Sequence, residues 1–168
     1  MKWLELLNEK IQDLPTLLEQ SDWSSIVVDK KEPHTYRVFK IIDGIRICLH
    51  RFEPCSLDQA FPHAHRWPGA FRVLQGQYLM KLGIAPDQES DPEFITTMIL
   101  NQGSSYTMDN PLLWHVVQPL IECFSVAING TNYQERHVKA PTTDNKGLRE
   151  MTSEELNNHL KQFQRLLQ

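Results

Sequence analysis

Apolar residues at the start of the chain recur at steps of three and four positions, which is the period of an α-helix. The residues of this stripe are Leu4, Leu7, Ile11, Leu14 and Leu18. They predict a helix from residue 3 to about residue 20. Pro15 is expected to kink or divide it, because proline removes a backbone donor and crowds the preceding turn.

From about residue 24 the pattern changes to short runs of β-branched and aromatic residues. These runs cover residues 25–28, 36–42, 45–52, 70–80, 94–100, 114–117, 122–128 and 132–138. Turn-forming sequences separate them, and Asp43-Gly44 between two apolar runs predicts a tight hairpin. Eight or so strands with no helix between them predict an all-β, antiparallel sandwich or barrel.

The helical period returns at the end of the chain. Thr152 is followed three residues later by Glu155, the spacing of a capping box. Apolar residues then recur at helical steps, at Leu156, Leu160, Phe163 and Leu167. The pattern predicts three segments: a helical segment over 1–23, a β-domain over 24–139, and a linker with a C-terminal helix over 140–168.

Composition narrows the range of partners. The chain has 168 residues and a formal net charge of -4, and its longest basic cluster is Lys30-Lys31. The length predicts a single domain. The charge predicts that it binds neither nucleic acid nor a membrane surface, so small molecules are the better candidate partners. Three cysteines without a CxxC spacing argue against a disulfide framework and indicate a reducing compartment. With no secretory signal and no apolar run of membrane-spanning length, a cytoplasmic protein is expected.

Two histidines carry the strongest chemical signal. His63 and His65 are two residues apart, so on an extended chain their imidazoles point to the same face. Imidazole is a ligand for iron, zinc, copper and nickel. The best third ligand on another strand is His115, within the run Leu113-Trp-His-Val-Val. A half-buried histidine with an ordinary hydrogen bond is the competing interpretation of each position.

The stretch from His63 to Gly76 resembles the first motif of the cupin superfamily, G-x5-H-x-H-x3,4-E-x6-G. His63, His65 and Gly76 are in register with it, and His115 aligns with the histidine of the second motif, G-x5-P-x-G-x2-H-x3-N. The resemblance covers roughly residues 36–131. It implies a cupin double-stranded β-helix, or jelly-roll barrel, with a divalent metal on His63, His65 and His115. It also implies a homodimer.

The chain departs from the cupin motifs at several positions. Gly69 stands where the first motif has its glutamate ligand, and we expect it to face the cavity without supplying a ligand. Leu57 and Leu112 replace motif glycines. A site of three histidines and no glutamate is similar to that of the cysteine-dioxygenase-like cupins. That similarity favours Fe(II), with zinc, nickel and manganese as alternatives.

Arginines near the histidines are candidates for binding an anionic substrate. They are Arg46, Arg51, Arg66 and Arg72, and the spacing does not choose among them, although strand alternation places Arg72 on the opposite face. His50 is expected to be partly exposed. The leading functional hypothesis is a mononuclear non-haem iron dioxygenase acting on a small anionic organic molecule. A non-catalytic, small-ligand-binding or sensing cupin, with or without a metal, is the alternative.

Overall fold

The computed structural model describes residues 2–28, 32–87, 90–131 and 147–168. Two helices, α1 (Lys2–Leu17) and α2 (Ser153–Leu166), flank the strands. The strands are β1 (Ser24–Val28), β2 (Thr35–Ile42), β3 (Ile45–Phe52), β4 (His63–Ala64), β5 (Gly69–Gln75), β6 (Gln77–Ile84), β7 (Glu93–Asn101), β8 (Ser105–Met108), β9 (Leu113–Pro119), β10 (Cys123–Asn129) and β11 (Leu148–Arg149). The predicted strand at 132–138 and most of the predicted linker lie outside the described residues.

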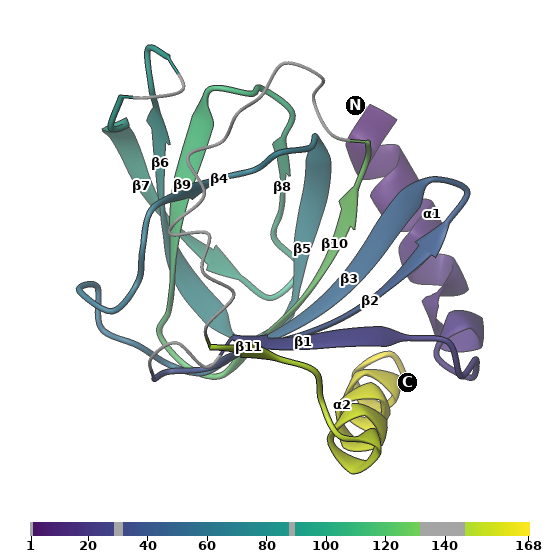
Figure 1. Cartoon of the computed structure of the whole chain (residues 1–168). Helices are drawn as coiled ribbons and strands as arrows, with labels where there is room; N and C mark the ends of the chain where they lie inside the picture. Colours follow the sequence, from purple (N-terminus) through teal and green to yellow (C-terminus); the bar gives the residue numbers. More distant parts are fainter. Residues whose placement is uncertain (1, 29–31, 88–89, 132–146) are drawn as a thin grey trace.

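The strands form two antiparallel sheets that face each other. The larger sheet has the order β11-β1-β2-β3-β10-β5-β8, and the smaller has the order β4-β9-β6-β7. Figure 1 shows both helices on the outer side of the larger sheet, with the smaller sheet across the barrel interior. This is the predicted jelly-roll architecture with terminal helices, and it is confirmed.

Two local predictions can be compared directly with the structure. Asp43 and Gly44 form a two-residue turn with φ angles of 51° and 77°, and Ile42 pairs with Ile45 across it, so the tight hairpin is confirmed. The division of the first helix at Pro15 is wrong, because α1 continues to Leu17. Pro15 lies in the last turn of α1, so only two helical residues follow it.

The apolar run predicted over 70–80 is two strands. Gly76, with a φ of 90°, separates β5 in the larger sheet from β6 in the smaller one. A Cβ at this position would lie 2.4 Å from the carbonyl oxygen of Glu122, so only glycine fits there. A single residue therefore transfers the chain between the sheets.

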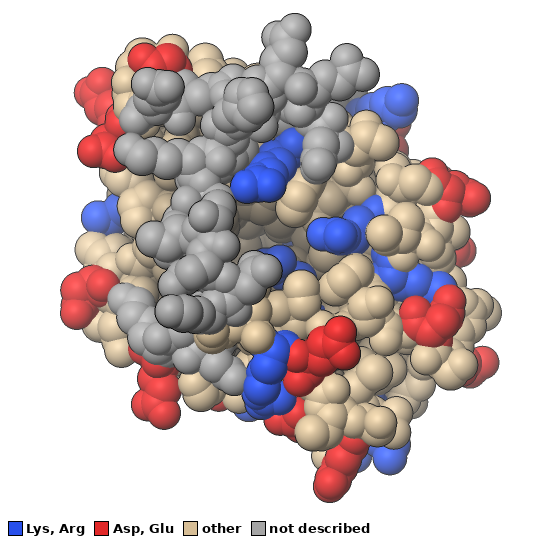
Figure 2. Space-filling view, viewed as in Figure 1, with Lys and Arg blue, Asp and Glu red and all other residues tan. Residues whose placement is uncertain are grey.

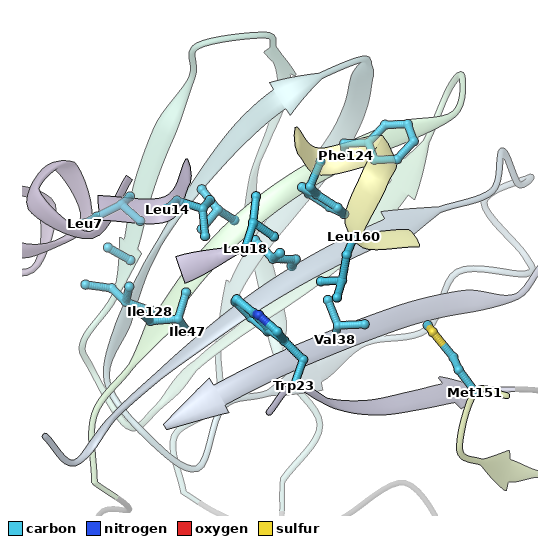
Figure 3. Packing of buried hydrophobic residues seen from close by; sticks show 14 of the residues in the cluster. Leu7, Leu14, Leu18, Trp23, Val38, Ile47, Phe124, Ile128, Met151 and Leu160 are labelled. Atoms are coloured by element: carbon cyan, nitrogen blue, oxygen red, sulfur yellow. The ribbon is translucent and has the colours of Figure 1, made fainter. Parts of the chain in front are cut away.

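The main hydrophobic core lies between the helices and the outer face of the larger sheet. Figure 3 shows Leu14, Leu18 and Trp23 meeting Val38 and Ile47 of the sheet. The inner faces of the two sheets enclose smaller clusters, one around Val73 and Tyr78 and another around Cys48 and Phe71. Because successive strand residues point to opposite faces, the larger sheet supplies both the helix-facing core and the barrel interior.

The C-terminal helix begins as its sequence predicts. The Thr152 hydroxyl accepts a hydrogen bond from the Glu155 backbone N–H at 3.2 Å, and the Glu155 carboxylate accepts one from the Thr152 backbone N–H at 2.8 Å. This capping box satisfies two backbone donors. The pairing of β11 with β1 just before it was not predicted, because two residues carry too little pattern. In the described part of the chain, neither helix is long and apolar enough to cross a membrane.

His159 of α2 gives the fold a dependence on pH. The ring is 4% exposed, and burial, followed by the nearby charge of Arg51, lowers its pKa from 6.5 to about 4. The unfolded chain therefore binds a proton between pH 6.5 and 4 that the folded protein excludes, so stability falls as the pH is lowered through this window. His159→Asn removes this titration, and we expect the variant to lose about 2 kcal/mol less stability than wild type between pH 7.5 and pH 5.

Urea unfolding at the two pH values measures the effect. The same loss of stability in both proteins would show that His159 titrates normally in the folded state.

Candidate metal centre

The site is built by the pairing of β4 with β9. His63 lies directly opposite His115 in this register, so both side chains point from the smaller sheet into the barrel. His65 follows β4 at the two-residue spacing and points to the same region. The predicted same-face arrangement of the three histidines is therefore present, and His115 is buried with 2% exposure.

The three rings turn the same nitrogen toward one point. His115 Nε2 lies 2.9 Å from His65 Nε2 and 2.9 Å from His63 Nε2. The ligand atoms of all three residues lie within 4.8 Å of one another. An imidazole nitrogen carries either one proton or one lone pair in the ring plane, so His115 Nε2 cannot form good hydrogen bonds to both neighbours. A shared cation would satisfy all three nitrogens.

Two of these spacings are close to those of nitrogens that share one metal ion. Nitrogens bound at about 2.1 Å lie about 3.0 Å apart at a right angle, and about 3.4 Å apart at the tetrahedral angle. Both separations from His115 Nε2 are 2.9 Å, and the whole group lies within 4.8 Å. Three histidine ligands would leave at least one coordination position open to a molecule from outside.

The protonation of the histidines suits metal binding. The Nδ1 of His63 lies 3.3 Å from the Phe61 carbonyl oxygen, an acceptor that favours the proton on Nδ1 and leaves Nε2 free as a ligand. Burial lowers the pKa of His63 to about 4 and lowers the pKa of His115 well below its usual range. Both rings are then neutral at pH 7, the form that binds a metal.

Gly69 has no room for a side chain. A Cβ at this position would lie 2.4 Å from the Ile128 carbonyl oxygen and 2.7 Å from Asn129 Oδ1. The glutamate of the cupin motif therefore does not fit here. Gly69 shares a face of β5 with Phe71, whose ring centroid is 5.1 Å from that of His65, so the glycine lies on the barrel side of the strand.

Of the four candidate arginines, the structure places only Arg46 on the inner face of the barrel. Arg72 is on the outer face as predicted, where it donates to Asn8 Oδ1 of α1 at 2.7 Å, and Arg51 pairs with Glu122 at 2.7 Å. Arg66 is exposed. Arg46 shares the inner face of β3 with Cys48 and lies over the ring of Trp67, with its guanidinium carbon 5.5 Å from the ring centroid.

Two inward residues were missed by the sequence reasoning. His50 is 7% exposed, not partly exposed as expected, because it points into the barrel. Arg37 of β2 lies opposite it, and its Nε donates to His50 Nε2 at 2.8 Å. The two-residue Asp43-Gly44 turn fixes the hairpin register, so counting outward from the turn would have placed Arg37 beside His50.

No protein-family model and no curated protein matches the sequence. Similar solved structures include hydroxypropylphosphonic acid epoxidase from S. wedmorenis, with a TM-score of 0.47 and 16% identity over 62% of this chain and 55% of that one. The iron(II) form of HppE gives a TM-score of 0.49 and 16% identity over 63% of this chain and 56% of that chain. Cobalt(II) HppE in complex with substrate gives a TM-score of 0.45 and 17% identity over 60% of this chain and 55% of that chain. The chain spans little more than half the length of these matches, and the likeness assigns no activity.

Proposed function

We propose that this protein is a metal-binding cupin in which His63, His65 and His115 hold one divalent metal ion. The supporting observation is the approach of His115 Nε2 to both neighbouring Nε2 atoms at 2.9 Å, within a barrel interior. Neutral nitrogen ligands leave the charge of a divalent ion uncompensated, so an anionic molecule from outside would complete the site. The native substrate is therefore a small organic anion.

Fe(II) is the favoured metal, and oxidation of the substrate by dioxygen is the favoured reaction. An iron ion held by the three histidines would supply the chemistry of oxygen activation. The Phe61 carbonyl orients the His63 ring, and the stacked rings of Phe71 and Tyr106, 4.8 Å apart, form an apolar wall that excludes water. Zinc, nickel and manganese are the alternative metals.

Cobalt(II) substitution tests this proposal without knowledge of the substrate. Untagged protein is depleted of metal, loaded with Co(II), and examined by elemental analysis and visible absorption. One equivalent of cobalt with the weak absorption of a six-coordinate ion is the expected result. Strong tetrahedral absorption would contradict the iron-type site. Failure to bind Co(II), together with no iron in the protein as purified, would leave the alternative of a metal-free, non-catalytic ligand-binding or sensing barrel.

We also propose that the protein is a homodimer and that β7 lies in the contact. β7 is an edge strand whose Phe94, Ile95 and Ile99 are 39%, 60% and 55% exposed. Exposed apolar groups of this kind mark interaction surfaces. The strand carries one charge, Glu93, at its end, so a second copy can lie against it without opposing like charges.

The double variant Ile95→Lys/Ile99→Lys is expected to be monomeric. Four lysines at a two-fold contact repel one another and must lose water on association. Light scattering at micromolar concentration should give the monomer mass of 19.6 kDa for the variant and twice that mass for wild type. Ile41→Lys, at an equally exposed isoleucine of β2, is the matched control and should remain dimeric. A monomeric wild type would exclude the dimer.

A further inference from the structure

Two arginine side chains point into the barrel from neighbouring strands. Arg37 lies on β2 and Arg46 on β3, on the face that also carries Phe39 and Cys48. The guanidinium carbon of Arg46 is 4.6 Å from the centroid of the Phe39 ring. Arg46 pairs with Ile41 of β2, and Phe39 lies between Ile41 and Arg37 along that strand. The contact with Phe39 therefore directs the Arg46 side chain toward Arg37. Burial lowers the pKa of Arg37, and the nearby charge of Arg46 lowers it further.

Neither guanidinium is paired with an acid among the residues that the structure describes. The described ion pairs of nearby strands join Arg51 to Glu122 and Lys40 to Asp22, both away from the barrel interior. In Figure 2 basic side chains gather around the central hollow between β4 and β3, and acidic ones lie mostly toward the outline. Aromatic rings stabilise Arg46 but do not neutralise it. Two partly buried cations without a counter-charge favour binding of an anion.

His50 adds a hydrogen-bond donor to this pair. Arginine stays protonated, so Arg37 Nε donates and His50 Nε2 accepts in their 2.8 Å hydrogen bond. The neutral His50 ring must then carry its proton on Nδ1. That buried atom has no hydrogen-bond partner in the described part of the chain, and neither does the indole N–H of Trp67, over which Arg46 lies. Both orphaned groups are donors, and both would be satisfied by oxygen acceptors of a ligand.

We propose that Arg37, Arg46 and His50 form a subsite for a dianion, a small organic acid with two negatively charged groups and no ammonium group. The proposal rests on the function proposed above, because the substrate would reach from this subsite to the three histidines. The subsite adjoins them, because Arg46 lies over the ring of Trp67, whose centroid is 6.4 Å from that of His65. A monoanion would leave one guanidinium uncompensated, and a zwitterion would bring a further cation among these groups.

Binding of dicarboxylates to the full-length protein tests the subsite. The probes are oxalate, malonate, succinate and glutarate, measured by calorimetry with and without bound Co(II). Butyrate and aspartate are the comparisons for succinate, because butyrate lacks one carboxylate and aspartate adds an ammonium group to the same carbon chain. We expect at least one dicarboxylate to bind, and succinate to bind about tenfold or more tightly than either comparison.

Arg37→Gln and Arg46→Gln are each expected to weaken binding of the best dicarboxylate by about tenfold or more. Arg72→Gln, on the outer face of β5, is the matched control and should bind it as wild type does. Near-UV circular dichroism checks folding. If Arg37→Gln does not fold, Arg46→Gln decides alone, because its guanidinium makes no hydrogen bond within the described residues.

The outcomes separate the subsite from the metal centre. Arginine-dependent dicarboxylate binding in protein that takes up no metal would uphold the subsite and reject the metal proposal. Protein that binds Co(II) but no dicarboxylate would reject the subsite alone. Equal affinity for succinate and butyrate, or unchanged affinity in both arginine variants, would also overturn it.

Discussion

Replacing His63 or His65 by alanine is expected to reduce bound metal from about one equivalent to background. His63 Nε2 and His65 Nε2 each lie 2.9 Å from His115 Nε2, so each variant removes one of the three converging nitrogens. Loss of a group that only orients a ligand costs about 10- to 100-fold in metal affinity, so loss of a ligand should exceed about 100-fold. Both residues are only partly buried, so the variants should fold.

Elemental analysis of untagged protein, and titration with Co(II), measure the change. His34→Ala is the matched control, since His34 precedes β2 and is not part of the three-histidine group. Metal content that stays at one equivalent in both site variants would reject the assignment of these histidines as ligands. A loss in the control as great as in the site variants would show that the effect is not specific to the three histidines and would remove this support for the site.

Replacing Phe163 by alanine is expected to lower the free energy of unfolding by about 3–5 kcal/mol. The Phe163 side chain is fully buried on the side of α2 that faces the sheet. Its ring meets Phe124 of β10 edge-on, with the centroids 5.4 Å apart. Alanine would leave a cavity between the helix and the sheet that neither can fill by a small shift. For a domain whose total stability is about 5–15 kcal/mol, this is a large fraction.

Urea unfolding at pH 7.5 measures this loss. Phe94→Ala is the matched control, because Phe94 is 39% exposed on β7 and its removal should cost much less. A similar cost at the two positions would mean that α2 contributes little to the core.

Much of this architecture follows from local pattern. Asp43-Gly44 specifies both a hairpin and its register, Thr152 and Glu155 specify a helix start, and the spacing of His63 and His65 specifies a shared face. Each of these depends on residues close in sequence, so period and turn chemistry suffice to predict it.

The failures of prediction concern contacts between distant segments. Gly76 looks like one residue within an apolar run, and only the pairing of β5 and β6 with strands of different sheets shows that the chain changes sheet there. Gly69 stands at the ligand position of the motif, and only the approach of the β10 backbone shows that a side chain has no room there. The number of residues between motif positions does not carry that information. The burial of His50 depends likewise on the sheet that closes over it.

The alternation along β3 has a consequence for how this protein can change. Ile47 and Leu49 lie in the core beneath the helices, and Arg46, Cys48 and His50 line the barrel. Substitution on the barrel side leaves the helix-facing core in place, so the side chains that line the barrel can change one at a time through point mutations. Insertion of one residue in this strand would reverse every side chain beyond it, placing charged groups under the helices and aliphatic groups in the barrel. Lineages of this chain should therefore vary in length at turns and keep the length of β3 fixed.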